Sequence, residues 1–363
     1  MEEQRVRRVL QGLREKGLFQ LLVTDPISIF YLTGIKIQPG ERFYGLLLRQ
    51  DGEHRFFLNH LFAVPQEVGV KKLWYFDTDS VAERIAPCLE REKCLGIDGQ
   101  MQAKFLLPLM EMQAASGFVV ASDVVDQVRG RKEQAEQEKM RQSSRINDLA
   151  MAAFRKLLRD GVTEKEVAEQ MLEIYRRLGA EGFSFAPLVA FGANAADPHH
   201  APDDTVLREG DVVLLDVGCI KDGYCSDMTR SFFYRKVSEK HRAIYEIVRE
   251  ANAAAIAKIR PGIPLQELDR AARERIEQSG YGEQFNHRLG HSIGLSEHEA
   301  GDVSAGNPTP AETGMIFSIE PGIYLEGEVG VRIEDLVLVT ETGCEVLNHF
   351  SKDLEIIGEE KEV

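Results

Sequence analysis

The chain has 363 residues, 43% hydrophobic and 28% charged, a composition typical of a folded protein rather than a disordered one. Its 59 acidic and 44 basic residues give a net charge of −15, which repels nucleic-acid phosphates, so we expect no nucleic-acid partner. Five cysteines, without a Cys-x-x-Cys pair, disfavour a disulfide framework. No apolar run approaches the roughly 18 residues needed to cross a bilayer, and the N-terminus is an amphipathic helix rather than a secretory segment. The sequence predicts a cytoplasmic protein with no membrane partner.

Helix and strand signals alternate through the first third of the chain. Short apolar runs bounded by turn residues predict strands at 21–25, 30–34, 45–50, 54–60, 73–77, 94–99 and 118–122. The Asp51-Gly52 pair between two of these runs is a hairpin signal. Helices are expected over 79–92 and 101–113. Together these elements indicate a compact α/β domain.

A polar stretch over 125–145 separates this domain from the rest of the chain and leads into a helix that ends near Leu158. We expect an N-terminal domain of residues 1–126 and a C-terminal domain of residues 127–363. Further helices are expected after the Thr163–Glu166 capping box and over 239–258 and 265–280.

A weak internal repeat is the most informative feature of the C-terminal half. The segments GDVVLLDVG (210–218) and GMIFSIEPG (314–322) each contain an apolar run, which predicts a buried strand. In both segments an acidic residue ends this run. One acid at a strand end would ordinarily face water, but each of these strands is followed by a turn and a second acid. The resulting pairs are Asp216 with Asp227, and Glu320 with Glu334.

Each acid pair is symmetric about a turn, the first about 221–222 and the second about Gly327. In an antiparallel hairpin the two acids of a pair would face each other with Cβ atoms roughly 4.5–5.5 Å apart, where like charges are destabilising. Such crowding indicates that cations lie between the carboxylates.

Divalent ions fit this arrangement, since two of them neutralise four carboxylates and two-metal hydrolytic sites hold their ions roughly 3.5–4 Å apart. One imidazole would complete a mixed nitrogen and oxygen ligand set suited to Mn²⁺, Co²⁺, Fe²⁺ or Zn²⁺. Three histidines in a short segment, His287, His291 and His298, offer that imidazole. His291 stands between Gly290 and Gly294, which allow the backbone to fold closely around it.

Four segments resemble the signature of the Xaa-Pro peptidases, prolidase and aminopeptidase P, which are dinuclear pita-bread metallopeptidases. They are DVG (216–218) with Asp227 downstream, GHSIGLSEHE (290–299), SIEPGIY (318–324) and GVRIED (330–335). The N-terminal half, with YLTG followed by PGERF, is similar to the creatinase/prolidase-type domain. The resemblance implies an α+β protein, with a C-terminal pita-bread (creatinase/aminopeptidase-like) domain and a smaller N-terminal α/β creatinase-type domain. It also implies a homodimer.

The resemblance further implies two divalent ions per subunit, Mn²⁺ or Co²⁺ ahead of Zn²⁺ or Fe²⁺. A hydroxide between the ions would be the nucleophile, and Glu320 would relay its proton. The implied metal ligands are Asp216, Asp227, His291, Glu320 and Glu334.

Four further residues receive roles around the substrate. His199 would hold the substrate or stabilise the oxyanion, and His298 would donate to the scissile-bond region or to the leaving nitrogen. His287 would line the pocket. Arg332, two residues before Glu334 on the same strand, would orient that acid or anchor a substrate carboxylate.

The predicted activity is therefore metal-dependent hydrolysis of Xaa-Pro bonds in small proline-containing peptides. Dipeptidase and aminopeptidase activities both stay open, because the sequence has no lysine or arginine between Glu299 and Arg332 to add a second anchor for a carboxylate. Two alternatives remain. One is a non-peptidase hydrolase of the same superfamily acting on an amidino or acylated amino acid, and the other is a non-catalytic pita-bread binding protein.

Overall fold

The structure is a computed structural model that describes residues 1–358. The chain divides into two compact units between Arg129 and Gly130. The boundary expected between residues 126 and 127 falls within helix α5 (Asp123–Gly130). The protein is α+β, as predicted, and each unit is described by itself.

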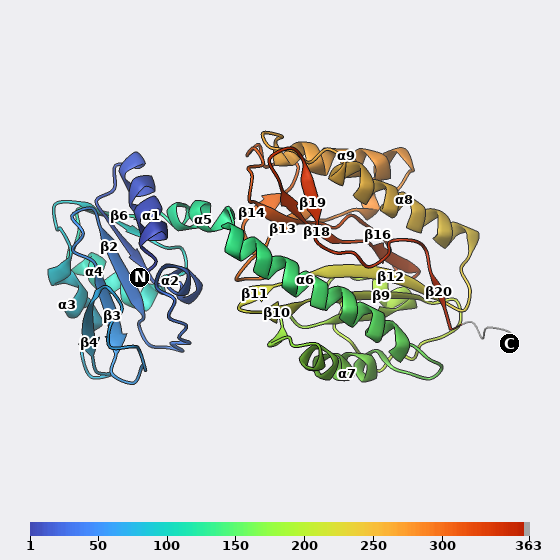
Figure 1. The fold of residues 1–363 in the computed structure, drawn as a ribbon, viewed down its shortest axis with the longest axis horizontal. Helices are drawn as coiled ribbons and strands as arrows, with labels where there is room; N and C mark the ends of the chain where they lie inside the picture. The colour runs from blue at the N-terminus through green and yellow to red at the C-terminus, as the bar shows by residue number, and fades with distance from the viewer. Residues whose placement is uncertain (359–363) are drawn as a thin grey trace. The chain divides into compact units, whose positions relative to one another are not determined.

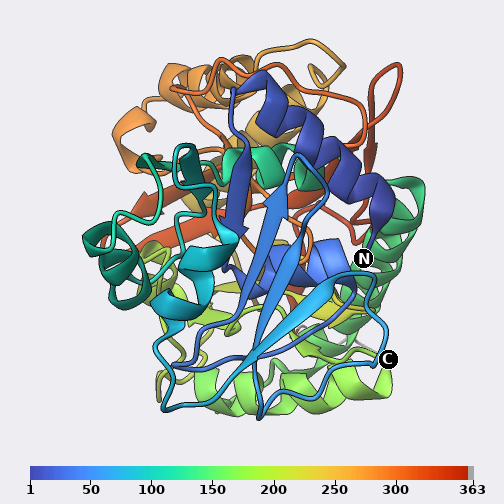
Figure 2. The same cartoon turned by 90° about the vertical axis from the view of Figure 1, so that its left-hand side faces the viewer.

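The N-terminal unit is a mixed sheet of six strands with helices packed on it (Figure 2). The strand order is β4-β3-β2-β1-β5-β6, with parallel pairs at both ends and antiparallel pairs in the middle. The strands are β1 (Gln20–Val23), β2 (Gly45–Arg49), β3 (Arg55–Asn59), β4 (Lys71–Tyr75), β5 (Cys94–Ile97) and β6 (Gly117–Val120). The main helices besides α5 are α1 (Glu3–Glu15), α2 (Pro26–Thr33), α3 (Val81–Ile85) and α4 (Ala103–Glu111).

One predicted strand of this unit, 30–34, is wrong, because the segment belongs to helix α2. The Asp25 side chain caps the helix by accepting from the backbone N–H groups of Ile27 and Ser28, and Pro26 occupies its first turn. Gly34 ends the helix with φ of 73°. These start and stop signals override the apolar run, which is compatible with a buried helix as well as with a strand.

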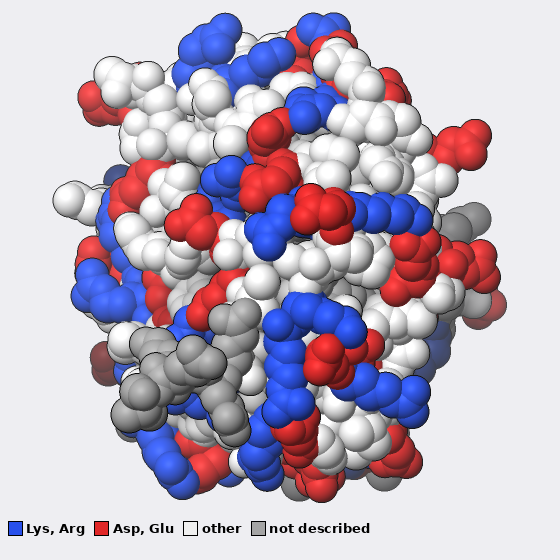
Figure 3. Space-filling model, turned by 90° about the vertical axis from the view of Figure 1, so that its right-hand side faces the viewer, with Lys and Arg blue, Asp and Glu red and all other residues white. Residues whose placement is uncertain are grey.

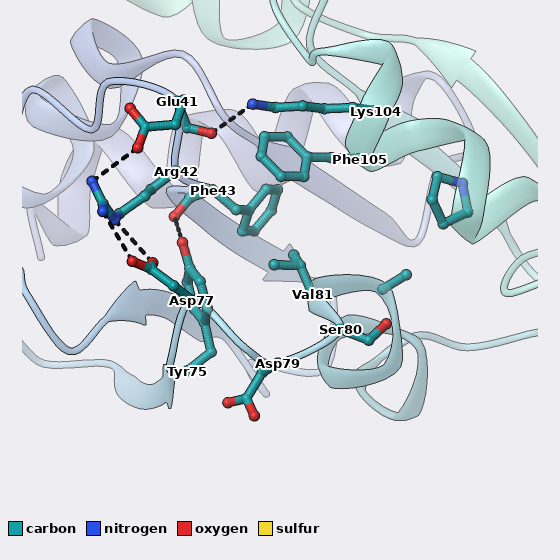
Figure 4. Close-up of a pocket in the computed structure, with 12 residues that line it drawn as sticks. Glu41, Arg42, Phe43, Tyr75, Asp77, Asp79, Ser80, Val81, Lys104 and Phe105 are labelled. Carbon is teal, nitrogen blue, oxygen red and sulfur yellow. Dashed lines mark hydrogen bonds and ion pairs between the residues drawn. The ribbon is translucent and has the colours of Figure 1, made fainter.

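A cavity of about 490 Å³ in the N-terminal unit is lined by charged groups that have partners within the protein (Figure 4). Arg42 makes two 2.9 Å hydrogen bonds to Asp77 and lies 3.1 Å from the Glu41 carboxylate. Lys104 donates to the Glu41 carbonyl at 2.7 Å. These charges are therefore satisfied by the protein itself.

The C-terminal unit contains four main helices and several small sheets. The helices are α6 (Gln134–Phe154), α7 (Glu164–Arg177), α8 (Glu239–Ile256) and α9 (Leu265–Gln278). The strands that build the site are β8 (Leu188–Phe191), β9 (Val212–Val217), β12 (Met228–Tyr234), β13 (Gly290–Ser292), β15 (Ile316–Ile319), β16 (Gly322–Leu325), β17 (Val329–Arg332) and β18 (Asp335–Val339). The remaining strands are β7 (Gly182–Phe183), β10 (Cys219–Lys221), β11 (Tyr224–Cys225), β14 (Glu299–Val303), β19 (Cys344–Val346) and β20 (Ile356–Ile357).

Strand β9 is central because it contributes to two apolar clusters on its opposite faces. Val213 and Leu215 pack with α6 and α7, whereas Val212 and Leu214 pack with α8 and α9. Figure 1 shows these two helix pairs on different sides of the strands. Since side chains alternate along a strand, Asp216 shares the face of Val212 and Leu214. A polar residue therefore enters at the end of an otherwise buried strand.

The surface of the C-terminal unit mixes charges of both signs. Figure 3 shows lysine and arginine side chains interleaved with aspartate and glutamate over one face, rather than gathered into an extended basic patch. Among residues 1–358, no helix combines the length and apolar character required to cross a lipid bilayer.

Candidate metal centre

Two hairpins bring four carboxylates to one cavity of about 420 Å³ in the C-terminal unit. All the residues predicted for the site line this cavity. They are His199, Asp216, Asp227, His287, His291, His298, Glu320, Arg332 and Glu334.

The first hairpin has a different register from the one predicted. Asp216 pairs with Thr229 rather than with Asp227. The reason is the turn, where Asp222 and Gly223 both have positive φ, 48° and 79°, as in a two-residue type I′ turn. Asp227 nevertheless lies two residues before Thr229, so the side-chain alternation favours the same face for both acids.

The second hairpin has the register predicted from the sequence. Ile319 pairs with Asp335 on one side of the two acids, and Gly322 pairs with Arg332 on the other. Glu320 and Glu334 therefore occupy opposed positions in the gap between two antiparallel ladders.

Three of the carboxylate oxygens are buried and have no hydrogen-bond partner within residues 1–358. They are Asp216 Oδ1, Asp227 Oδ1 and Glu334 Oε1. A buried ionised oxygen without a partner costs several kcal/mol, so such a cluster needs protons or cations. Burial and the neighbouring acids raise the pKa of Asp227 and of Glu334 well above the ordinary range. Burial also raises the pKa of Glu320 to about 7.

His291 completes the cluster from β13. Its Nε2 atom lies 3.6 Å from Asp227 Oδ2 and 3.4 Å from Glu320 Oε1. Its Nδ1 faces the Ser292 carbonyl at 3.2 Å, which assigns the hydrogen to Nδ1 and leaves the Nε2 lone pair toward the acids. Burial lowers the pKa of His291 to about 3, so the ring is neutral. Ligand atoms of Asp227, His291 and Glu334 lie within 4.8 Å of one another, and this donor set fits a divalent ion.

Gly290 allows strand β13, which contains His291, to pack closely against strand β15, which precedes Glu320. A Cβ atom on Gly290 would lie 1.9 Å from the Ser318 carbonyl oxygen, so only glycine permits this approach of β13 to β15. The Ser318 hydroxyl accepts from the His291 backbone N–H and donates to Glu320, both at 2.9 Å. The glycine thus serves strand packing, and Ser318 connects two of the predicted ligands.

Arg332 is almost completely buried, at 3% exposure, and each of its guanidinium nitrogens donates within the protein. The acceptors are Thr229 Oγ1 at 3.1 Å, the Tyr324 hydroxyl at 2.9 Å and Asp216 Oδ2 at 2.6 Å. The Thr229 hydroxyl in turn donates to Glu334 at 2.7 Å. Arg332 therefore contacts Asp216 directly and Glu334 through Thr229.

The three other predicted histidines, His199, His287 and His298, line the same cavity. The His298 ring centroid lies 4.0 Å from that of His291. His287 Nε2 lies 3.0 Å from the Tyr324 hydroxyl, and burial lowers the pKa of His287 to about 4. Burial also lowers the pKa of His298. Neutral rings at these positions can donate or accept a hydrogen bond toward a ligand.

A second group of acids and histidine, centred on Glu164, is already saturated by the protein. One carboxylate oxygen accepts from Phe191 N–H at 2.7 Å and the Asn194 amide at 3.0 Å. The other lies 2.7 Å from His200 Nε2 and accepts from Asp203 N–H at 3.0 Å. Because these partners occupy its acceptor positions, Glu164 ties down the segment that contains His199 rather than offering a metal ligand.

Sequence reasoning missed the connecting residues Thr229, Ser318 and Tyr324, the cation Arg288 and an apolar wall of the cavity. The wall consists of Phe185, Ala186, Pro187, Leu188, Pro198, Ala201 and Pro202. These are ordinary residue types, and only their position in the folded chain distinguishes them. The adjacency of Pro198 to His199 was the one available signal.

Comparisons with known proteins agree with this geometry. Residues 138–341 match the model of metallopeptidase family M24, and residues 5–130 match the creatinase/prolidase N-terminal domain. An uncharacterized peptidase of Staphylococcus aureus is 37% identical over 96% of this chain and 99% of its own length.

Two solved structures show the same two-domain fold. A recombinant prolidase from Thermococcus sibiricus has a TM-score of 0.91 and 31% identity, covering 98% of this chain and 99% of its own. An X-Pro aminopeptidase from Thermotoga maritima has a TM-score of 0.85 and 30% identity, covering 97% of this chain and 99% of its own. With a creatinase-type domain in front of a pita-bread domain whose acids and histidine suit divalent metal, the chain belongs to metallopeptidase family M24 and is a metallopeptidase.

Proposed function

We propose that this metallopeptidase hydrolyses the peptide bond that precedes proline in small peptides. One observation carries the proposal. The three residues with buried carboxylate oxygens that have no partner within residues 1–358 line the same cavity as an apolar wall that contains three prolines and Phe185. The cavity therefore combines carboxylates that can bind metal with an apolar surface that can hold the proline ring. The prolidase and X-Pro aminopeptidase structures support the same substrate class.

Five residues would hold two divalent ions in this proposal. They are Asp216, Asp227, His291, Glu320 and Glu334. When bound, such ions lower the pKa of water and polarise the carbonyl of the scissile bond. Mn²⁺ and Co²⁺ are the proposed ions, because the donors are carboxylate oxygens with a single imidazole nitrogen.

The chain's own residues supply positioning and proton transfer. Glu320 lies at the cavity and would take the proton from water and pass it on. His298 stands beside His291 at the cavity and donates to the departing proline nitrogen, while His199 holds the substrate carbonyl. Arg332 keeps Asp216 in place, and His287 lines the pocket beside Tyr324.

The apolar wall explains why proline suits the cavity. A bond to proline has no N–H, so its binding site requires no acceptor at that position. The pyrrolidine ring instead requires an apolar surface, which Phe185, Pro187, Pro198 and Pro202 provide.

The proposal is tested with Ala-Pro and Ala-Ala as substrates of the purified full-length protein. We expect manganese- or cobalt-dependent cleavage of Ala-Pro, abolished by a chelator, and at least about tenfold weaker cleavage of Ala-Ala. Equal cleavage of both peptides would contradict the proline specificity. Cleavage that persists after complete metal removal would contradict the proposed metal role.

A further inference from the structure

We propose that a buried ion pair between Lys132 and Glu299 positions His298 beside the scissile bond, an inference that rests on the proposed function of that histidine. Lys132 Nζ lies 2.7 Å from Glu299 Oε2, and the two side chains are only 1% and 2% exposed. Neither residue is among those that line the cavity. The pair would therefore act through the histidine and not on a substrate.

The Glu299 carboxylate fills the inside of the loop that carries His298. Residues 293–298 form this loop, which connects strand β13 to strand β14. The second carboxylate oxygen of Glu299, Oε1, accepts from the Leu295 N–H at 3.0 Å. A Cβ atom on Gly294 would lie 2.7 Å from the same oxygen, so the loop backbone packs directly against the carboxylate. The loop is thus folded around Glu299.

The conformation of this loop decides where the His298 ring stands. Within the loop, the Gly294 N–H donates to the Ser296 carbonyl at 3.0 Å. The Gly294 carbonyl accepts from the Cys225 N–H at 2.8 Å, which connects the loop to strand β11. The loop ends at His298, whose ring centroid lies 4.0 Å from that of the predicted ligand His291. A shift of the loop would therefore move the His298 ring relative to the metal centre.

The carboxylate inside the loop needs the cation of Lys132, because removal of one partner from a buried ion pair leaves an uncompensated buried charge. The backbone of Lys132 is itself held in place. Its N–H donates to the Gly314 carbonyl and its carbonyl accepts from the Gln137 side-chain amide, both at 2.8 Å. Stability alone is a weak reason for a buried ion pair, since apolar residues of similar volume are often as stable. A requirement for geometry explains the pair better.

The test combines variants of the ion pair with removal of His298. The full-length, manganese-loaded proteins are the wild type, Glu299→Gln, Lys132→Met, Lys132→Met/Glu299→Gln, His298→Ala and His298→Ala/Glu299→Gln. Arg131→Met is the matched control, because Arg131 adjoins Lys132 and pairs with Glu312 at the same distance of 2.7 Å, but with side chains 49% and 44% exposed. The kcat and KM for Ala-Pro, the melting temperature and the bound manganese are measured for each protein.

We expect Glu299→Gln and Lys132→Met to lower kcat by about 10- to 100-fold, because a displaced proton donor slows the chemical step. KM should stay within about threefold of wild type, and the manganese content should not change. In the His298→Ala background, Glu299→Gln should lower kcat by less than about twofold, since its effect passes through the histidine. Arg131→Met should behave as wild type.

The double variant Lys132→Met/Glu299→Gln separates positioning from stability and remains informative if a single variant fails to fold. Both buried groups are then neutral, and the glutamine oxygen can still accept from the Leu295 N–H. We expect most of the wild-type melting temperature to return. The kcat should nevertheless stay at least about fivefold below wild type, because a neutral pair does not fix the loop as the ion pair does.

Three results would overturn the inference and leave the proposed function intact. They are a full additional loss of kcat from Glu299→Gln in the His298→Ala background, loss of manganese from Glu299→Gln, and wild-type kcat in the double variant. The first two would show a structural role only, and the third would show that the charges are not needed. If the wild type does not cleave Ala-Pro, or if His298→Ala keeps the wild-type kcat, the proposed role of His298 and this inference fall together.

Discussion

Arg332 donates to Asp216 over 2.6 Å, and this contact holds one oxygen of the acid while the other oxygen has no partner within residues 1–358. The two carboxylate oxygens of Asp216 therefore have different surroundings. One oxygen of Asp216 is fixed by the protein, and we propose that the other oxygen binds a metal ion. The same guanidinium reaches Glu334 through Thr229, so one arginine positions two proposed ligands.

Replacement of Arg332 tests this positioning role. Arg332→Met removes donors from Asp216, Thr229 and Tyr324, so we expect the free energy of unfolding to fall by about 3 kcal/mol. Urea unfolding and metal titration measure the effect, with exposed Arg242→Met as the control. Arg332→Lys keeps the charge but cannot reproduce three divergent hydrogen bonds, so an intermediate result is expected. An unchanged urea midpoint and unchanged metal affinity in Arg332→Met would contradict the role.

Glu334→Gln separates metal binding from stability. In the metal-free protein this change removes like-charge repulsion at a buried oxygen, so we expect unfolding to require about 1–2 kcal/mol more free energy at pH 8. Metal affinity should fall by at least about 100-fold, because a carboxylate ligand is lost. Denaturant melts with and without Mn²⁺ provide both quantities, and Glu341→Gln on the exposed surface is the control. A variant less stable than wild type without metal would show that the acids do not repel one another.

The pH dependence of the metal-free protein follows from the raised pKa values. Burial raises the pKa of Asp227, Glu334 and Glu320, the last to about 7. Burial lowers the pKa of the cavity histidines His287, His291 and His298, so these rings are neutral in both states only above about pH 6.5. The folded protein therefore holds more protons than the unfolded chain between about pH 6.5 and 8. Stability should therefore fall as pH rises through this window, by roughly 2 kcal/mol. Thermal melts after chelation measure this slope, and saturating Mn²⁺ should remove or reverse it. A flat profile without metal would count against a strained acid cluster.

The residue pattern predicted the register of one of the two acid-bearing hairpins and not that of the other. Symmetry about Gly327 predicted the opposed positions of Glu320 and Glu334, because both flanking ladders keep one register. The same reasoning misplaced Asp216 against Asp227, since the Asp222–Gly223 turn shifts the pairing by two residues. Side-chain alternation survives a two-residue shift, which is why the acids still line one cavity.

The missed residues act through contacts between distant segments. Ser318 connects His291 to Glu320, and Thr229 connects Arg332 to Glu334, but serine and threonine in a strand carry no distinguishing pattern. Helix α2 was missed because an apolar run is ambiguous, although its Asp25 cap and Pro26 start were readable.

Glu164 provides a test of the second acid group. Glu164→Gln replaces one acceptor oxygen by an amide donor among four donating partners, so we expect a loss of about 1–3 kcal/mol in unfolding free energy. Metal content should be unchanged. Activity should fall, because the segment with His199 loses its anchor. Thermal unfolding together with elemental analysis decides the matter, and a folded variant that has lost one metal ion would instead identify Glu164 as a ligand.

Anomalous diffraction from crystals grown with Mn²⁺ tests the central claim, that divalent ions hold the four acids together, most directly. We expect anomalous peaks about 2.0–2.3 Å from the oxygens of Asp227 and Glu334 and from His291 Nε2, with Asp216 Oδ1 bound as well. The absence of any peak among these residues in manganese-saturated crystals, with the carboxyl groups hydrogen-bonded to one another, would contradict the account.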